Sequence, residues 1–464
     1  MVKKNGNLTI EIENVTAKGF GIAKINDFVL FTDGGLPGDK LNVKVIKVKQ
    51  RYGYGKILNI ITPSPYRIQS PCPVSDKCGG CQWQHCDYQA QLGFKKQIVT
   101  DALVRIAGLS NPAVADVIGM ETPQPYRNKA VFPVVPVPQE NPRGGEAPSD
   151  GFAIGMYAPR SHRIIPIHVC AIQHPIHTPI IKIVSDFMRR HKIEPYDEIT
   201  HSGIMRHIVI RTSQATGQVM IVLVVNADHI IKENRLAAAL TDTGATTVII
   251  NSHTARSNTI MGHNFRNLTG EGFIREKIGQ VWYQLSAPSF FQVNPVQTAV
   301  LYEAAVAMAG LTGTEVVMDA HVGVGGLALA AAGRARQVLG VDIVQDAITD
   351  AKKNAKLNGI TNARFLCGPA EELIPRLLAN RDTIPDVIFL DPPRKGCDKA
   401  LLEAISAAEI ETVVYVSCDP ATLARDIKLL VHGGYALAAA QPVDMFPMTG
   451  KVETVALLRR KHAI

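Results

Sequence analysis

The chain has no apolar run that approaches the ~20 residues needed to span a bilayer. Residues 1–6 lead into polar residues rather than into the apolar segment of a secretory signal, so we expect no such signal. Eight cysteines are too few for a disulfide scaffold in a chain of 464 residues. These absences predict a cytoplasmic protein whose thiols stay reduced and serve metal binding or catalysis.

Acidic residues are absent from residues 40–60, a segment that is rich in lysine. The net charge is +8 and the pI is about 9.0, which favours a polyanionic partner only in general terms. The distribution is more specific, because no acid follows Asp39 within residues 40–60. Such a stripe can neutralise the phosphates of a polyanion, although a solvated strand face would look the same. The basic residues of this stripe are Lys40, Lys44, Lys47, Lys49, Arg51 and Lys56.

The order of patterns along the chain predicts three domains. Residues 1–60 alternate apolar and polar positions between glycines, which indicates a small β-barrel, a kind of fold that often binds nucleic acid. Residues 61–285 read as a central α+β domain that carries a cysteine cluster. In this region we expect a helix near residues 89–107, packed on the C-terminal domain, and a flexible insertion at 136–150. Residues 286–464 form the third domain.

The third domain alternates strands and helices, which predicts a doubly wound α/β sheet of the Rossmann-like kind. Ligands of such sheets bind beyond the carboxyl ends of the strands. The expected strands are Glu315–Ala320, Gln337–Asp342, Ala363–Gly368, Asp386–Asp391, Thr412–Ser417, Tyr435–Pro442 and Val452–Leu458.

Three of these strand ends predict a cofactor site. The first strand runs into a glycine-rich turn that contains Gly323, where the backbone can approach a ligand closely. Asp342 ends the second strand, at the distance where an acid accepts hydrogen bonds from ribose hydroxyls. A NAD enzyme could share both features. Asp391 opens the sequence Asp-Pro-Pro-Arg, which resembles a nucleic-acid methyltransferase motif and implies S-adenosylmethionine as cofactor.

Cys418 and Glu453 predict the chemistry. Carbon 5 of uracil is a poor nucleophile, and a thiolate added at carbon 6 makes it enolate-like. A base must later remove the carbon-5 proton so that the thiolate can leave. Cys418 follows an apolar strand and precedes a predicted helix, whose N-terminal end should lower the thiol pKa. Glu453 can serve as the base.

Four segments resemble the RNA uracil-5-methyltransferase family, and within it the 23S ribosomal RNA branch of bacteria. The resemblance runs almost end to end and implies a TRAM domain, a central RNA-binding domain and a class I methyltransferase domain. The segments are Phe-Phe-Gln-Val-Asn-Pro-Val-Gln at 290–297, Asp-Pro-Pro-Arg at 391–394, Ser-Cys-Asp-Pro-Ala-Thr at 417–422 and Val-Glu-Thr-Val at 452–455.

The resemblance also implies roles for particular residues. Cys418 would be the nucleophile and Glu453 the base. The chain departs from the family in having His321-Val322 before the first loop glycine and Lys451 two residues before the base. The cofactor-binding residues implied are Gln292, His321, Gly323, Asp342 and Asp391.

A group of cysteines predicts a metal centre. Cys72, Cys78 and Cys81, completed by Cys170, offer four thiolates, which suit either zinc or an iron–sulfur cluster. Cys86 could replace Cys81 on spacing alone. The C-x3-C-x2-C spacing of radical S-adenosylmethionine enzymes is absent from the sequence. The resemblance to cluster-bearing family members implies a 4Fe–4S cluster.

Three alternatives remain open at the level of sequence. A cytosine-5 methyltransferase would place its nucleophile in another context and would lack the segments around Cys418 and Glu453. A noncatalytic RNA-binding factor could keep the fold, but retention of both residues argues against it. The substrate could be ribosomal RNA, which we favour, or the T-loop of transfer RNA. The sequence does not indicate the oligomeric state.

Overall fold

A computed structural model describes residues 2–137, 151–379 and 384–461. The chain forms two compact units. The first combines residues 1–71, 81–123 and 296–464, and the second combines 72–80 and 124–295. This division does not decide the three-domain boundaries expected at 60/61 and 285/286, which stay a prediction. The insertion expected at 136–150 falls almost wholly outside the described residues. Among the described residues, no helix is both long and apolar enough to cross a membrane.

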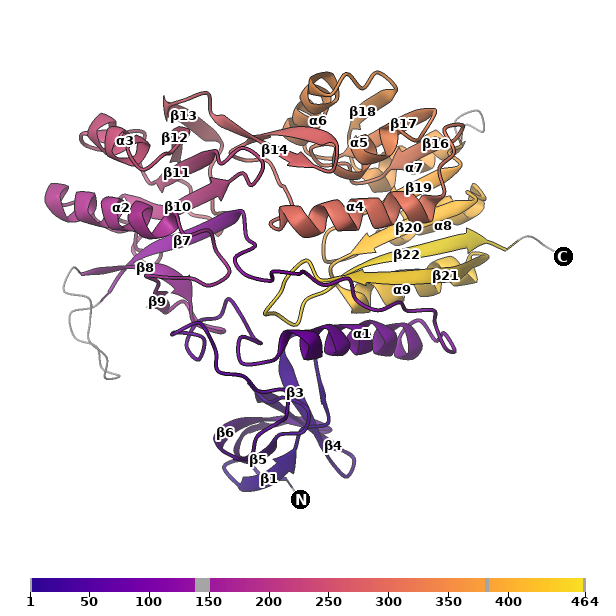
Figure 1. Cartoon of the computed structure of the whole chain (residues 1–464), viewed down its shortest axis with the longest axis horizontal. Helices are drawn as coiled ribbons and strands as arrows, with labels where there is room; N and C mark the ends of the chain where they lie inside the picture. Colours follow the sequence, from indigo (N-terminus) through magenta and orange to yellow (C-terminus); the bar gives the residue numbers. More distant parts are fainter. Residues whose placement is uncertain (1, 138–150, 380–383, 462–464) are drawn as a thin grey trace. The chain divides into compact units, whose positions relative to one another are not determined.

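The N-terminal part of the first unit is a six-stranded sheet in the order β1-β5-β6-β4-β3-β2. Contacts between β1 and β3 bring its ends together, which confirms the expected small barrel (Figure 1). Side chains from alternate positions, such as Leu30 and Val43, fill its core. The strands are β1 (Asn7–Glu11), β2 (Asn14–Val15), β3 (Phe20–Ile25), β4 (Phe28–Asp33), β5 (Lys40–Val48) and β6 (Tyr52–Thr62).

The C-terminal part of the first unit is a seven-stranded sheet in the order β18-β17-β16-β19-β20-β22-β21. All of its pairings are parallel except those of β22, which runs antiparallel to both of its neighbours. Each expected strand is present within two residues of its predicted bounds. The strands are β16 (Val316–Asp319), β17 (Gln337–Asp342), β18 (Ala363–Cys367), β19 (Val387–Leu390), β20 (Thr412–Ser417), β21 (Tyr435–Val443) and β22 (Glu453–Arg460).

The chain changes direction across this sheet between β16 and β19. From β16 it moves outward through β17 to β18, and it then returns to β19 and proceeds the other way. Because parallel crossovers are right-handed, the two series of helices fall on opposite faces, which confirms the doubly wound fold. The helices after β16 are α5 (Gly326–Ala332), α6 (Gln345–Leu357), α7 (Ala370–Ala379), α8 (Lys399–Ala407) and α9 (Pro420–His432), preceded by α4 (Pro295–Ala309).

Helix α1 (Tyr88–Arg105) belongs to the first unit and packs against α9 and β21. Asp87 caps its N-terminus by accepting a hydrogen bond from the amide of Ala90 at 3.1 Å. Val99 and Leu103 of α1 are buried in one core with α7, α8, α9 and the central strands. This core fixes the positions of the loops at the carboxyl ends of the strands.

The second unit contains a seven-stranded sheet in the order β13-β12-β11-β10-β7-β8-β9 and a separate hairpin of β14 and β15. Its core is formed by the apolar strands together with α2 (His177–His191) and α3 (Glu233–Thr241). The strands are β7 (Lys129–Pro136), β8 (Phe152–Tyr157), β9 (Ile164–Pro166), β10 (Met205–Thr212), β11 (Val219–Val225), β12 (Thr247–Ser252), β13 (Asn264–Thr269), β14 (Phe273–Ile278) and β15 (Val281–Ser286).

Candidate active site

Cys418 lies between the end of β20 and the start of α9. The apolar residues before it form a buried central strand, and Pro420 begins the helix. Asp419 caps α9 by accepting hydrogen bonds from the amides of Ala421 at 2.9 Å and Thr422 at 3.1 Å. The Asp419 carboxylate is therefore engaged at the helix end, while the Cys418 thiol is only partly buried.

The strand register places Glu453 beside Cys418. In the antiparallel pair of β20 and β22, Ser417 lies opposite Thr454. The next residues in each direction are Cys418 and Glu453, so the expected nucleophile and base come from neighbouring strand ends. The Glu453 residue is buried, with 4% of its surface exposed.

The pKa of the Cys418 thiol differs from the value expected from the sequence. The helix end was expected to lower the thiol pKa, but burial and the negative charge of Glu453 raise the pKa of Cys418 to about 11. Arg394 opposes this rise through its charge and a hydrogen bond to the thiol. The free protein therefore holds Cys418 as a thiol at neutral pH, and Arg394 is the cation placed to stabilise its thiolate.

Glu453 has a pKa that suits a general base. Burial and the negative charge of Asp391 raise its pKa to about 8, against the opposing charges of Arg394 and Lys451. A base titrating near the working pH can both accept and release a proton efficiently. The raised pKa also means that this carboxyl is mostly protonated in the free protein at neutral pH.

These two pKa values predict that activity rises with pH. The thiolate fraction of Cys418 should grow about tenfold per pH unit between pH 8 and 10. Below pH 8 the loss of the Glu453 carboxylate should make the decline steeper. Measuring kcat/KM for RNA methylation from pH 6 to pH 10 would test this. A flat profile over this range would contradict the assigned roles.

A buried network holds the loop that carries Asp391 and Arg394. Asp426 of α9 accepts hydrogen bonds from the Cys397 amide at 2.9 Å and from the Tyr415 hydroxyl at 2.6 Å. Arg425 pairs with Asp426 at 2.7 Å and donates to the Lys395 carbonyl at 2.9 Å. Because Asp426 is fully buried, these bonds fix the loop backbone directly after Arg394.

A second buried pair holds the segment that leads into Glu453. Lys95 of α1 donates to Asp444 at 2.5 Å and to the Phe446 carbonyl at 3.1 Å, and both charged side chains are fully buried. Gln91, one turn earlier, accepts a hydrogen bond from the Met448 amide at 3.0 Å. Helix α1 thus positions residues 444–448, which precede Lys451 and Glu453.

The glycine-rich turn after β16 has the geometry expected of a cofactor loop. Gly323 and Gly325 have φ angles of 53° and 98°, which favour glycine over residues with a side chain. Apart from its two chain neighbours, no atom of the described residues lies within 4 Å of the place where a Cβ on Gly323 would stand. Burial lowers the pKa of His321 to about 4, and its buried Nδ1 has no hydrogen-bond partner in the described structure. A polar ligand group could satisfy that nitrogen.

Three carboxyl groups gather at the ends of β16, β17 and β19. Burial, together with the charges of Asp391 and Asp342, raises the pKa of Asp319 to about 7. Burial alone raises the pKa of Asp391 to about 7. Asp319 also accepts hydrogen bonds from the amides of His321 at 3.2 Å and Ala328 at 3.1 Å. These bonds hold the backbone of the glycine-rich loop in place. This acidic surrounding suits a cationic sulfonium ligand.

Asp342 should determine cofactor affinity. Its two oxygens accept one amide hydrogen bond each, from Gly323 at 2.9 Å and Val344 at 2.8 Å, and each retains a lone pair for a ribose hydroxyl. Asp342→Asn puts an amide donor where an acceptor is needed, so the Kd for S-adenosylmethionine should rise about 10- to 100-fold. Isothermal titration would measure this, with the exposed Asp346→Asn as the matched control. Equal affinities of the two variants would refute the assignment.

Gln292 belongs to the second unit, whereas the other expected cofactor residues belong to the first. Its backbone carbonyl accepts a hydrogen bond from the Asn128 side chain at 3.1 Å, and its residue surface is 8% exposed. Its role in cofactor binding therefore stays a prediction from the resemblance.

Three of the four cysteines expected to bind a metal lie in one unit. Cys72, Cys78 and Cys170 lie in the second unit and interact electrostatically, and burial is the main cause that raises the pKa of Cys78 and of Cys170. Cys81 belongs to the first unit. Across the described residues, no group of three or more His, Cys, Asp or Glu side chains is arranged to hold a metal ion. The structure therefore does not support the expected 4Fe–4S cluster.

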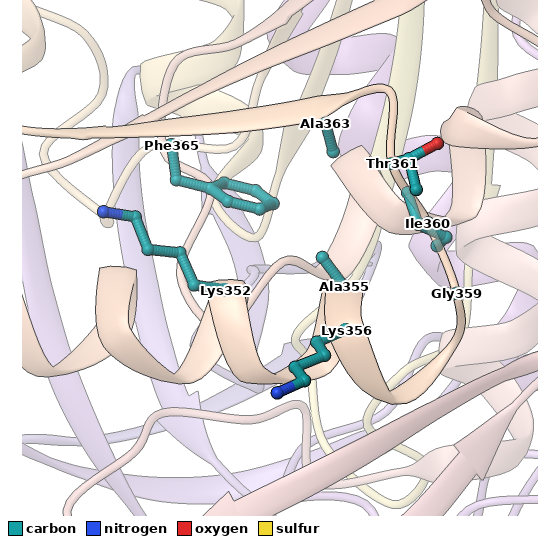
Figure 2. Close-up of a pocket in the computed structure, with 8 residues that line it drawn as sticks. All are labelled: Lys352, Ala355, Lys356, Gly359, Ile360, Thr361, Ala363 and Phe365. Atoms are coloured by element: carbon teal, nitrogen blue, oxygen red, sulfur yellow. The ribbon is translucent and has the colours of Figure 1, made fainter.

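A pocket of about 340 Å³ lies between α6 and the edge strand β18 (Figure 2). It borders Ala363, which begins β18, whereas Asp342 stands at the opposite end of the paired strands. The pocket is therefore separate from the carboxyl-end site. Its lining residues are Lys352, Ala355, Lys356, Gly359, Ile360, Thr361, Ala363 and Phe365.

Sequence reasoning missed several contributors to the site. The sequence identifies Arg394 only as part of the Asp-Pro-Pro-Arg motif, and its position after two prolines is the signal that marks it. Asp319 ends a strand, as Asp342 does, and could have been recognised on that ground. Asp426 and Lys95 act through contacts with distant segments, which one sequence alone does not reveal.

Comparisons with known proteins agree with this geometry. Residues 232–461 match the family model described as tRNA (Uracil-5-)-methyltransferase, and residues 3–58 match the TRAM domain. An uncharacterized RNA methyltransferase of Halalkalibacterium halodurans is 44% identical over 99% of this chain and 98% of that protein. Another from Clostridium tetani is 44% identical over 98% of this chain and 97% of its own length.

One solved structure resembles the whole chain. It is the tRNA (uracil-54, C5)-methyltransferase of Pyrococcus abyssi in complex with S-adenosyl-L-homocysteine. Its TM-score is 0.76 at 26% identity, and the match covers 97% of this chain and 99% of that one.

Proposed function

Because the chain belongs to the RNA uracil-5-methyltransferase family, we propose that it works through a covalent bond between Cys418 and carbon 6 of the target uridine. The protein is an S-adenosylmethionine-dependent RNA (uracil-5-)-methyltransferase with an RNA-binding TRAM domain. The mechanism is supported by the position of Cys418 and Glu453 at adjacent strand ends. Arg394 supports it further through a hydrogen bond to the Cys418 thiol.

The proposed reaction begins at the Cys418 sulfur. The thiolate adds to carbon 6, and the electron pair of the double bond moves toward carbon 5 and the carbonyl at carbon 4. Carbon 5 then gains the methyl group. Glu453 removes the remaining proton from carbon 5, the double bond reforms, and the bond from carbon 6 to sulfur breaks. Arg394 stabilises the thiolate at the start and at the end of this sequence.

The residues at the ends of β16, β17 and β19 fit the cofactor. When bound, S-adenosylmethionine supplies the electrophilic methyl group. Asp342 would accept hydrogen bonds from its ribose, and the open backbone at Gly323 would let it approach closely. His321 and Asp391 would hold polar and cationic parts of the ligand. The resemblance to the family also implies Gln292 as a cofactor residue.

For the substrate we propose 23S ribosomal RNA, on the basis of the resemblance to that branch of the family. Transfer RNA is the second candidate, because the family model and the Pyrococcus abyssi enzyme are both named for it. Purified protein should be incubated separately with unmodified 23S ribosomal RNA and with unmodified transfer RNA. Methylation of ribosomal RNA alone is expected, and methylation of transfer RNA alone would overturn this substrate assignment.

The 4Fe–4S cluster remains a proposal that rests on the cysteine pattern of Cys72, Cys78, Cys81 and Cys170. Protein purified without oxygen should be brown and should contain about four iron atoms per chain. Cys78→Ser should lose the colour and most of the iron, whereas Cys367→Ser, which changes an exposed cysteine, should keep both. Stoichiometric zinc without iron, measured by metal analysis, would contradict this proposal.

A further inference from the structure

The N-terminal barrel carries aromatic side chains on its outer surface. Its inner positions, such as Leu30, are buried, whereas the alternate positions on β3, β4 and β6 point outward. Those outward positions hold Phe20, Phe31, Tyr52 and Tyr54. Register confirms that they share one face, because Phe31 lies directly opposite Tyr54.

The four rings form one continuous aromatic face, defined here as Phe20, Phe31, Tyr52 and Tyr54. Tyr54 lies 6.1 Å from Phe20, 5.6 Å from Phe31 and 6.0 Å from Tyr52, measured between ring centroids. Phe31 and Tyr52 are 6.0 Å apart. Tyr52 has 40% of its surface exposed, and the other three residues are half-buried. Three of these four contacts are edge-to-face and the one between Phe31 and Tyr54 is tilted, and together they hold the rings in fixed orientations at the surface.

Lysines border this aromatic face on the neighbouring strand. Lys47 lies opposite Tyr54 in the pairing of β5 with β6, so the two side chains are on the same side. The Lys49 amide donates to the Tyr52 carbonyl at 2.7 Å, which places these residues next to each other. Lys56 follows Tyr54 by two residues and shares its face. Asp33, opposite Phe20, is an acid at the edge.

Aromatic cross-strand pairs would stabilise the barrel in any case, but this role leaves the exposed ring of Tyr52 and the adjacent lysines unexplained. Exposed rings beside cations are the features that bind nucleic acid in single strands. Each base has a flat π-face that can stack on an aromatic side chain, while the cations contact the backbone phosphates.

We propose that the aromatic face binds a single-stranded segment of the RNA substrate. Bases stack on Tyr52 and Tyr54, and Lys47, Lys49 and Lys56 contact the phosphates. A duplex would fit poorly, because its bases are already stacked on one another and their faces are inaccessible. RNA as the partner rests on the proposed function, which this inference deepens by naming the surface and the strandedness of its ligand.

The test measures RNA binding by the full-length protein without cofactor. The probes are a fluorescein-labelled oligouridine of about ten nucleotides and an RNA duplex of the same length. Tyr52→Leu and Tyr54→Leu should each weaken oligouridine binding about 5- to 100-fold, with little effect on the duplex. Tyr52→Phe and Tyr54→Phe keep the ring and should bind as the unaltered protein does.

The matched control is Tyr66→Leu, because Tyr66 lies outside the barrel strands and has a similar exposed fraction of 41%. Its affinity for oligouridine should be unchanged. Thermal melting of each variant checks that the barrel remains folded. Unchanged oligouridine binding by both leucine variants would overturn the proposal, and so would an equal loss of single-strand and duplex binding.

The lysines give an independent readout through salt. Lys47→Gln and Lys56→Gln should each reduce the slope of log affinity against log salt by about 0.7, the value per contact with single-stranded phosphate. The leucine variants should keep the slope. An unchanged slope in both lysine variants would contradict their phosphate contacts.

Failure of this inference and failure of the proposed function are distinguishable. Binding is measured without turnover. If the protein binds oligouridine through Tyr52 and Tyr54 but methylates no uridine, only the proposed function is contradicted. If the protein methylates uridine while its leucine variants bind oligouridine normally, only the proposed role of the aromatic face is contradicted.

Discussion

Glu453→Gln should accumulate a covalent protein–RNA adduct that survives denaturing electrophoresis. The amide keeps the shape of the side chain and a hydrogen-bonding oxygen, but it cannot take the proton from carbon 5. Addition of Cys418 and transfer of the methyl group should still proceed. The adduct should therefore carry label from methyl-labelled S-adenosylmethionine, while turnover falls by a factor of about 100 to 10,000.

Three observations would sharpen or overturn this result. A double variant with Cys418→Ala and Glu453→Gln should form no adduct, because the bond to carbon 6 cannot form. Normal turnover by Glu453→Gln would mean that the base lies elsewhere, and Asp419, next to the nucleophile, would be tested next. An inert variant without labelled adduct would mean that Glu453 positions the substrate instead.

Cys418→Ala should abolish methylation while leaving the affinity for S-adenosylmethionine within about twofold. The thiol acts on the base rather than on the cofactor, and loss of a covalent nucleophile typically costs a factor of about 10,000 or more in rate. The measurement is methyl incorporation into RNA in parallel with isothermal titration of the cofactor. Cys367→Ala, at an exposed cysteine, serves as the control.

Residual activity in Cys418→Ala above about 1% of the original rate would contradict covalent catalysis. Loss of cofactor binding together with activity would instead indicate that the substitution disturbs the loop between β20 and α9. The fully buried Asp426 of α9 accepts a hydrogen bond from Tyr415 of β20, which joins the two elements on either side of that loop independently of the thiol, so we expect the fold to persist.

The sequence predicted the C-terminal sheet well because its strands are short apolar runs bounded by glycine or charged residues. Val316–Asp319 and Thr412–Ser417 are nearly continuous in apolar residues, as expected of strands buried on both faces. Strand-end acids such as Asp342 could be assigned because chemistry in this fold concentrates at one end of the sheet.

Long-range effects could not be predicted in the same way. Lys95 and Asp444 are 349 residues apart in sequence and meet only in the folded chain. The sequence suggested a lowered pKa for Cys418 from the helix end, but burial and Glu453 dominate once the strands are paired. The metal cluster that the cysteine pattern predicts stays a prediction, because no group of three or more His, Cys, Asp or Glu side chains in the described residues is arranged to hold a metal ion.

The central claim is methylation of carbon 5 of uridine in RNA. The most direct test incubates the purified protein with unmodified RNA and methyl-labelled S-adenosylmethionine, digests the RNA to nucleosides and identifies the labelled nucleoside by mass spectrometry. We predict 5-methyluridine, formed by the unaltered protein and absent with Cys418→Ala. Label in 5-methylcytidine or in a ribose-methylated nucleoside would contradict this claim. So would the absence of any labelled nucleoside when the protein is shown to bind the RNA.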